Sequence, residues 1–310
     1  MLNFMPIISA SSLQTQLARR ITAFCGFSKG SGKTTALSWA LQTARQAGPT
    51  ALLTIGTHQA PAQSRSASSD SISNLPQLRV EPGDIVLTTL PLAKWSPASF
   101  EVLSLIPGRS SQGRLILGRA HRCGTVSLTG PEHFSSLRLA ADLIWREKWA
   151  ASVCLDGAAN RMTQLSALPR LQFIYTITVN TENWKACFTR LKMLEELTGL
   201  SKTDAAADKA PADSSAVSIS GPLTDSTAAA LPDQIKTVII DDFSKVFLNP
   251  EQWNRLCRSR AVKVRRSIRL LAVWLVLRDM RPDVIAEQLN ALRIPILFNP
   301  FEINNPDIPV

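Results

Sequence analysis

The feature that most constrains this chain is a glycine-rich decapeptide between two segments with different hydrophobic patterns. From Gly26 to Thr35 it reads Gly-Phe-Ser-Lys-Gly-Ser-Gly-Lys-Thr-Thr. The apolar run at 21–26 predicts a β-strand, and residues 34–47 predict a helix that is stopped by Gly48 and Pro49. A strand, a glycine loop and a helix in this order form the first half of a βαβ unit.

The loop has the residues needed to hold the phosphates of a nucleotide. Gly30 and Gly32 can adopt positive φ, so that several backbone N–H groups can surround a β-phosphate. Lys33 would then place its ammonium on the β- and γ-phosphates, and Thr34 would give its hydroxyl to Mg²⁺. The sequence predicts ATP and Mg²⁺ as cofactors, with ATP as the default nucleotide because no guanine-selecting Asn-Lys-x-Asp pattern is present. The predicted nucleotide-binding residues are Lys29, Gly30, Ser31, Gly32, Lys33, Thr34 and Thr35.

The loop departs from the strict P-loop pattern by one position. That pattern has a glycine five residues before Gly32, where this chain has Phe27, and Gly26 stands one residue earlier. Lys29 lies four residues before Lys33 and resembles the additional lysine of the deviant P-loop ATPases of the partition family, whose spacing is five. Two roles are open for Lys29, contact with the γ-phosphate or simple solvation.

A P-loop protein also needs an acidic residue that holds Mg²⁺ or its water, usually an aspartate at the end of an apolar strand. Asp156 ends the strand predicted at 151–155, and Asp241 ends the one predicted at 236–240. The sequence favours Asp156, because Asp241 lies beyond a linker-like segment. Lys33 and Asp156 are thus the predicted catalytic residues, and Thr34 and Asp156 the predicted metal ligands. Either aspartate could instead begin a turn or cap a helix.

Alternation of strands and helices continues along the chain. Further strands are predicted at 51–55, 84–90, 114–119 and 294–298, one or two strands within 262–277, and helices at 134–149 and 283–292. Asn249 and Pro250 predict a helix start, with Asn as its cap. The fold class expected is α/β, a mostly parallel sheet flanked by helices, in the Rossmann-like three-layer form of P-loop NTPases.

The expected organisation has four parts. Residues 1–18 form a leader and 19–200 the P-loop core. Residues 201–234, rich in Ala, Asp, Ser and Pro, are read as a flexible linker or insertion, and 235–310 as a C-terminal α/β part of the same domain. The polar segment 59–74 is expected to be a mobile loop near the ligand.

Composition narrows the classes of protein that fit. No signal-peptide pattern precedes the apolar residues 2–8, and the longest strongly apolar run, 270–277, is far shorter than the roughly 20 residues of a membrane-spanning helix. The five cysteines are scattered singly, which fits neither a zinc site nor a disulfide framework. The sequence predicts a cytoplasmic protein without membrane contact and leaves open whether it forms a homo-oligomer.

The formal net charge of +10 is concentrated in one stretch. Such a cluster can attract nucleic-acid phosphates or an acidic partner. A solvated face beside a buried strand is favoured, because no aromatic residues alternate with the charges to stack on bases. The basic residues are Arg255, Arg258, Arg260, Lys263, Arg265, Arg266 and Arg269.

Several segments together resemble one P-loop family, the ATP-binding proteins found with lysine 5,6-aminomutase and ornithine 4,5-aminomutase. The similar segments are Phe-Ser-Lys-Gly-Ser-Gly-Lys-Thr-Thr-Ala-Leu (27–37), Leu-Thr-Ile-Gly (53–56), Leu-Gly-Arg-Ala (117–120), Val-Ser-Leu-Thr-Gly-Pro (126–131), Leu-Asp-Gly-Ala-Ala-Asn-Arg (155–161) and Asp-Phe-Ser-Lys-Val-Phe (242–247). This resemblance implies an ATPase that reactivates a cobalamin-dependent aminomutase whose cofactor has been damaged, with the aminomutase as partner.

Two other functions stay open at the level of sequence. One is a small-molecule kinase or ATP-dependent ligase, in which segment 59–74 closes over a metabolite. The other is a nucleic-acid-associated ATPase that uses the basic stretch 255–269. Loss of turnover with retention of nucleotide binding is a further alternative.

Overall fold

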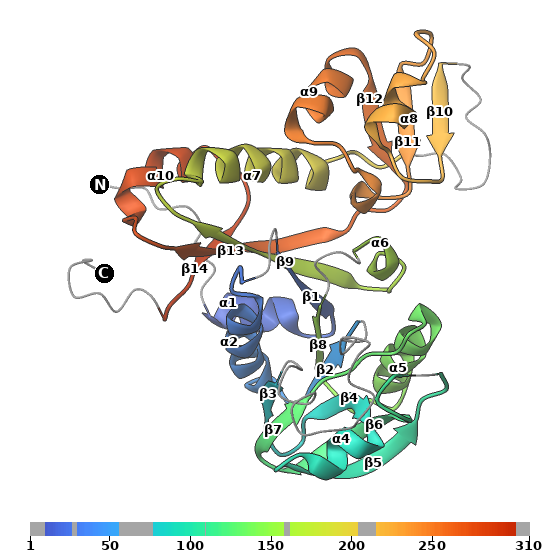
Figure 1. Cartoon of the computed structure of the whole chain (residues 1–310), viewed down its shortest axis with the longest axis vertical. Coiled ribbons are helices and arrows are strands. Elements are labelled where there is room, and N and C mark those ends of the chain that lie inside the picture. Colours follow the sequence, from blue (N-terminus) through green and yellow to red (C-terminus); the bar gives the residue numbers. More distant parts are fainter. Residues whose placement is uncertain are drawn as a thin grey trace, which may run out of the picture. The chain divides into compact units, whose positions relative to one another are not determined.

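A computed structural model describes residues 10–26, 30–55, 77–108, 110–157, 162–203 and 215–301. The chain is α/β, with a large, mostly parallel mixed sheet flanked by helices (Figure 1). It divides into two compact units, one of residues 8–176 and the other of residues 177–310 with 1–7. Among the described residues, no helix combines the length and apolar character needed to cross a bilayer.

In the sheet of the first unit, the strand before the glycine loop lies between two parallel neighbours. The strand order of this sheet is β9-β1-β8-β2-β4-β6-β5. Strands β9, β1, β8, β2 and β4 run parallel, whereas β6 is antiparallel to both β4 and β5. The bounds are β1 (Ile21–Gly26), β2 (Thr50–Thr54), β4 (Ile85–Thr89), β5 (Ser99–Leu105), β6 (Leu115–Arg122), β8 (Ser152–Asp156) and β9 (Leu171–Val179).

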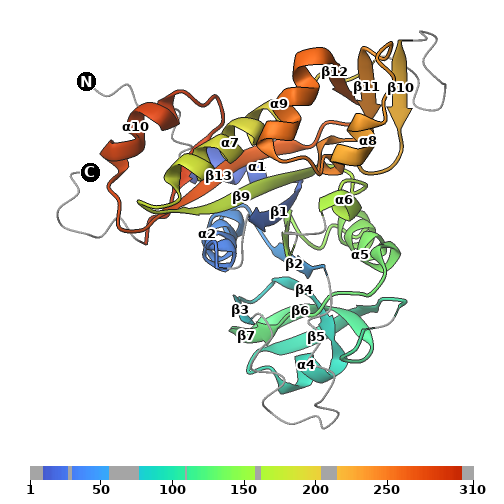
Figure 2. The same ribbon diagram turned by 45° about the horizontal axis from the view of Figure 1, so that its top comes forward.

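Helices cover both faces of these strands. Figures 1 and 2 show α1 (Ala10–Leu17) and α2 (Lys33–Arg45) on one side and α5 (Phe134–Arg146) on the other. Every residue of β1, β2, β4 and β8 is buried, as the central strands of a doubly covered parallel sheet should be. Smaller elements of this unit are β3 (Gln77–Val80), β7 (Gly124–Ser127), α4 (Leu90–Trp95) and α6 (Met162–Leu165), with β3 and β7 forming an antiparallel pair.

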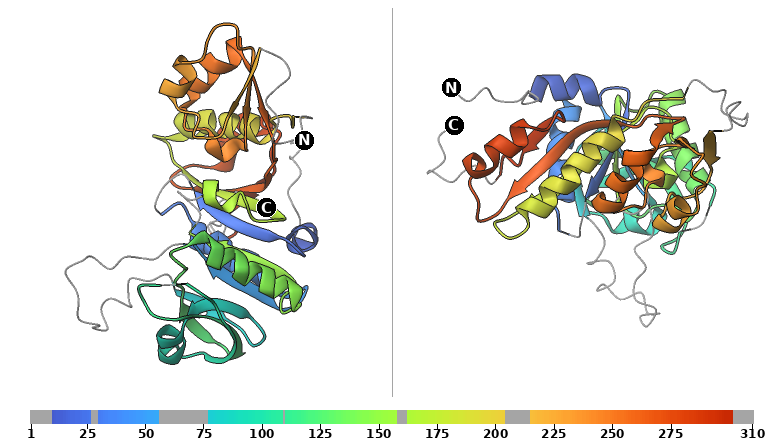
Figure 3. Two further views of the ribbon diagram at one scale, coloured as in Figure 1. Left: turned by 90° about the vertical axis from the view of Figure 1, so that its right-hand side faces the viewer. Right: turned by 90° about the horizontal axis from the view of Figure 1, so that it is seen from above.

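The second unit contains a small parallel sheet of its own, in the order β10-β11-β12. Helices α7 and α9 pack on the face that carries Val238 and Ile240, around the buried Trp253; Figure 3 gives two further views of these elements. The bounds are α7 (Trp184–Thr198), β10 (Ala216–Ile219), α8 (Asp225–Ala229), β11 (Thr237–Ile240), the 3₁₀ turn η1 (Phe243–Lys245), α9 (Pro250–Ser259) and β12 (Ala261–Val264).

The remaining strands of the second unit continue the sheet beside the last residues of β9, 177–179, which belong to the same unit. The strand order there is β14-β13-β9, and the Arg278 N–H donates to the Val179 carbonyl at 2.8 Å. The elements in this part of the chain are β13 (Arg269–Leu277), α10 (Pro282–Asn290) and β14 (Ile296–Phe298).

Most predicted elements form within a few residues of their expected bounds. The start of α9 is confirmed in detail, because Asn249 and Gln252 make a complete capping box. The sequence analysis identified neither β9 nor α7. Of the segment 201–234 interpreted as a linker, residues 216–219 form β10 and 225–229 form α8, and residues 204–214 lie outside the described part. The predicted loop 59–74 also lies outside it.

Candidate functional site

The glycine loop connects the carboxyl end of β1 to the first turn of α2. Gly30 and Gly32 have φ of 80° and 85°, in the left-handed region that a residue with a side chain rarely adopts. The two glycines therefore have the conformation that the sequence analysis required of them. Phe27, Ser28 and Lys29 lie outside the described residues, so that the two roles open for Lys29 stay predictions.

The amino end of α2 carries the first backbone N–H groups of the helix. Within the described part of the chain, no side chain caps this end, and its first turn contains no acidic residue. Gly32 is the N-cap and its carbonyl accepts from the Ala36 N–H at 2.9 Å. A helix terminus of this kind carries a partial positive charge that favours an anion. Thr34 in this turn is exposed, and Lys33 and Thr35 are half-buried.

Asp156 lies at the carboxyl end of β8, the strand next to β1. Parallel pairing of β1 with β8 matches Ala23 with Leu155, one residue before the aspartate. Asp156 is only 7% exposed. Gly157 follows with φ of 83°, and a Cβ there would lie 2.9 Å from the Ile55 carbonyl oxygen. The turn after Asp156 consequently requires glycine.

The connections that leave β1 and β8 run in opposite directions across the sheet. From β1 the chain passes through α2 to β2, beyond β8, and from β8 it passes through α6 to β9, on the other side of β1. Ligands of open parallel sheets bind outside the carboxyl ends of strands at such a switch point. The loop 30–34 follows β1, and Asp156 is the last residue of β8.

A chain of side-chain contacts joins the glycine loop to β9. The hydroxyl of Ser31 lies 2.8 Å from that of Thr176, which in turn donates to the Cys25 carbonyl at 2.9 Å. The Lys33 ammonium donates to Ser31 Oγ at 3.4 Å. Burial raises the pKa of the Cys25 thiol well above its ordinary value, while the positive charge of Lys33 acts in the opposite direction.

Gly26 has a steric role at this point. A Cβ on Gly26 would overlap Ser31 Oγ and would lie 2.5 Å from Thr176 Oγ1. The glycine that stands one place too early for the strict P-loop pattern therefore leaves room for the contact between Ser31 and Thr176. Sequence reasoning missed Thr176 because it did not identify β9, although the run Leu-Gln-Phe-Ile-Tyr-Thr-Ile-Thr-Val is typical of a strand.

The alternative acidic residue, Asp241, belongs to the second compact unit, whereas the glycine loop and Asp156 belong to the first. Asp241 follows β11 and forms an ion pair with Arg265 at 3.7 Å. Its neighbour Asp242 is fully buried, accepts from the Ser244 N–H and pairs with Arg266 at 3.2 Å. Asp242 thus caps the η1 turn.

Several arginines of the basic stretch 255–269 make hydrogen bonds or ion pairs within the second unit. Arg260 donates to the carbonyls of Leu231 and Ile235, and Arg265 and Arg266 pair with the two aspartates after β11. Arg260, Arg265 and Arg266 therefore make contacts within the second unit.

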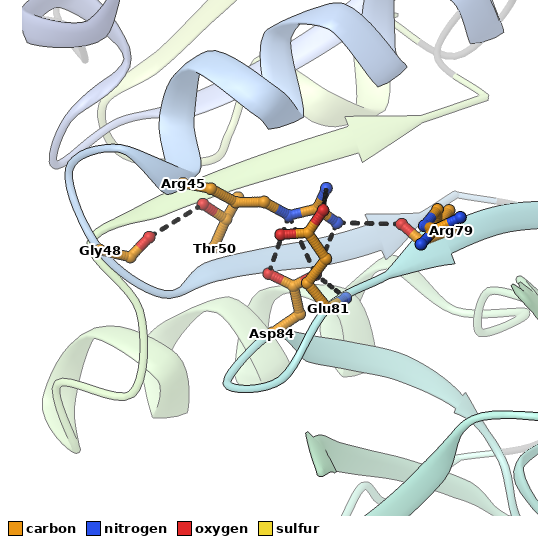
Figure 4. Close-up of polar contacts among 6 residues, drawn as sticks. All are labelled: Arg45, Gly48, Thr50, Arg79, Glu81 and Asp84. Carbon is orange, nitrogen blue, oxygen red and sulfur yellow. Dashed lines mark hydrogen bonds and ion pairs between the residues drawn. The ribbon is translucent and has the colours of Figure 1, made fainter. Parts of the chain in front are cut away.

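The far end of α2 is fixed by an ion-pair network (Figure 4). Arg45 donates to Asp84 and to the Arg79 carbonyl and forms an ion pair with Glu81 at 3.2 Å. Asp84 also accepts from the Glu81 N–H at 2.8 Å. The helix that begins at the glycine loop is therefore attached at its other end to the turn between β3 and β4.

Comparisons with known protein families, with curated proteins and with solved structures find no match.

Proposed function

We propose that the first unit is a P-loop module that binds ATP with Mg²⁺ and hydrolyses it. One observation carries the proposal: the loop with left-handed Gly30 and Gly32 and the start of α2 follow β1, and Asp156 ends β8, the adjacent strand at the switch point of the sheet. Backbone donors, a lysine and a buried carboxylate that can serve Mg²⁺ are among the parts that P-loop NTPases use in phosphoryl transfer.

The residues present fit a magnesium ion. Magnesium is held in proteins by one or two oxygen ligands, with phosphate oxygens and water completing the octahedron. Thr34 offers an exposed hydroxyl and Asp156 a carboxylate. Among the described residues, no group of three or more histidine, cysteine or acidic side chains is placed to hold a metal ion, and the proposed site relies on phosphate oxygens and water for its other ligands. Bound Mg²⁺ would neutralise charge on the phosphates.

Each residue then has a defined role. The Lys33 ammonium would contact β- and γ-phosphate oxygens, and the N–H groups at the start of α2 would donate hydrogen bonds to β-phosphate oxygens. Thr34 would bind the metal directly, and Asp156 would bind it or one of its waters.

The resemblance to the ATP-binding proteins found with lysine 5,6-aminomutase and ornithine 4,5-aminomutase extends the proposal to a biological role. In that role the chain uses ATP to reactivate a cobalamin-dependent aminomutase. The support consists of the segments quoted above, of which 27–37 and 155–161 include the loop and Asp156.

The test compares wild type with Lys33→Ala, using titration calorimetry for Mg·ATP and a phosphate-release assay. We expect wild type to bind and hydrolyse ATP and Lys33→Ala to lose both. Lys94→Ala removes an exposed lysine of the same unit and should behave as wild type. Wild type that binds no nucleotide would refute the proposal.

The reactivation role is tested separately with an aminomutase that has been inactivated by turnover. Recovery of its activity should require the wild-type chain together with ATP, and Lys33→Ala should give none. ATP hydrolysis that is unaffected by the aminomutase, with no recovery of its activity, would reject this role and leave ATP binding in place.

A further inference from the structure

We propose that Thr176 is a positioning residue for the phosphate-binding loop, acting through Ser31 on the ammonium of Lys33. The inference rests on the proposed binding of ATP at this loop. It assigns a role to a side chain on β9, a strand that contributes no residue to the P-loop pattern.

The direction of the hydrogen bonds follows from the number of protons available. A threonine hydroxyl has one proton, and that of Thr176 is donated to the Cys25 carbonyl at 2.9 Å. In the contact of 2.8 Å between Ser31 and Thr176, Ser31 must therefore be the donor. Its oxygen keeps lone pairs that accept from Lys33 Nζ at 3.4 Å. The chain thus runs from Lys33 through Ser31 and Thr176 to the backbone of β1.

Burial raises the energetic cost of losing any hydrogen bond in this series. Ser31 is 1% exposed and Thr176 is fully buried. A buried hydroxyl that loses its partner cannot be compensated by water, so each member depends on the others. Hydrogen bonds in series also polarise one another, and the polarisation here leaves the negative end of the Ser31 hydroxyl toward the ammonium.

The backbone on either side is arranged for the same contact. Gly26 is directly opposite Thr176 in the parallel pairing of β1 with β9. Because any Cβ on Gly26 would occupy the space of the two hydroxyls, the glycine and the hydroxyl pair form one structural feature.

The functional consequence is a preorganised loop. A segment with two left-handed glycines has many alternative conformations, and ordering it on binding would weaken affinity. Attachment of Ser31 to a buried strand removes part of that cost and places Lys33 near the start of α2 before any phosphate arrives. On this basis the bond should contribute to ATP affinity more than to the chemical step.

The test uses isosteric and conservative variants at both ends of the bond. Thr176→Val keeps the shape of threonine without its hydroxyl, and Thr176→Ser restores the hydroxyl. We expect Thr176→Val to raise the Kd for Mg·ATP about tenfold, the effect of one lost buried hydrogen bond, and Thr176→Ser to stay near wild type. KM for ATP should rise with little change in kcat.

Ser31→Ala removes the same bond from the loop side and keeps the inference testable if Thr176→Val fails to fold. The double variant Ser31→Ala/Thr176→Val should have a Kd for Mg·ATP no higher than that of the single variant with the higher Kd. Both substitutions break the same series of hydrogen bonds, so the second adds no further loss. Thr178→Val is the matched control: its buried hydroxyl, two residues along β9, has no hydrogen-bond partner among the described residues, so ATP affinity should not change.

Three outcomes have distinct meanings. Wild type that binds no ATP removes the proposed function and this inference with it. Wild type that binds ATP, with Thr176→Val or Ser31→Ala folded and binding equally well, refutes only the role of Thr176. Strictly additive losses in the double variant would also refute it, since independent sites add.

Discussion

Arg45 Nη2 lies 2.6 Å from Asp84 Oδ2, and Arg45 Nε donates to the same carboxylate. The aspartate is 2% exposed and the arginine 14%. A planar guanidinium that contacts a carboxylate through two nitrogens gives a strong and directional pair. This pair attaches the last residue of α2, at the end far from the glycine loop, to the turn before β4.

Arg45→Ala should destabilise the protein by about 3 kcal/mol, because it leaves a buried carboxylate without its partner. Urea unfolding followed by circular dichroism measures the change. Arg138→Ala is the control: Arg138 pairs with Asp142 at 3.8 Å and both are more than half exposed, so a loss below about 0.5 kcal/mol is expected. Equal effects of the two variants would contradict the assigned importance of the Arg45 pair.

Gly26→Ala should disturb the loop, because the added Cβ would overlap the hydroxyl of Ser31. We expect a loss of about 1–3 kcal/mol in stability from overpacking, together with weaker ATP binding. Thermal unfolding and calorimetry report the two effects. Gly221→Ala places a Cβ where no atom of the described residues lies within 4 Å, and it should leave both quantities nearly unchanged. A Gly26→Ala protein as stable as wild type would contradict the steric role assigned to Gly26, because the loop would then accommodate a Cβ at this position.

Asp156→Asn should change the magnesium dependence of ATP binding. Loss of the carboxylate charge weakens attraction for the cation, so affinity in the presence of Mg²⁺ should fall about tenfold or more, with a smaller change in EDTA. Asp241→Asn tests the alternative aspartate and should bind Mg·ATP as wild type does, because Asp241 pairs with Arg265 in the other unit. The opposite result, with Asp241→Asn impaired and Asp156→Asn normal, would transfer the metal role to Asp241.

The cysteines should differ in how alkylation depends on pH. Burial and then the charge of Glu196 raise the pKa of Cys257 from 9.0 to about 11. Because only the thiolate reacts, a raised pKa means slower labelling at pH 8 and a rate that still increases between pH 9 and 10. Iodoacetamide labelling with mass spectrometry should show this dependence, and Glu196→Gln should make Cys257 react faster at pH 8. Burial raises the pKa of Cys154 to about 12, and this residue should react only after unfolding.

Local sequence patterns predicted the elements around the loop because their signals are local. Apolar runs identify β1 and β8, and Gly48 with Pro49 ends the helix after the loop. The capping box at Asn249 is likewise a short-range pattern. Lys33, Thr34 and Asp156 could be proposed because they lie at the ends of such elements, at the start of α2 and at the end of β8.

Other features depend on packing between distant segments. Nothing in the sequence of β8 indicates that it lies between β1 and β2, since strand order is set by contacts far apart in the chain. Residues 216–229 look like linker by composition, yet β10 forms there because β11 offers a parallel partner, and Leu223 is fully buried. Thr176 could be assigned a role only when β9 was seen beside β1.

The close packing around Gly26 should restrict which substitutions occur at the positions that it contacts. In homologous sequences, the glycine at 26 and the hydroxyl residues at 31 and 176 should co-vary. These three positions lie up to 150 residues apart in the chain. A lineage with alanine at both 31 and 176 would lack the two side-chain oxygens that a Cβ at 26 would overlap, and would no longer need glycine there for that reason.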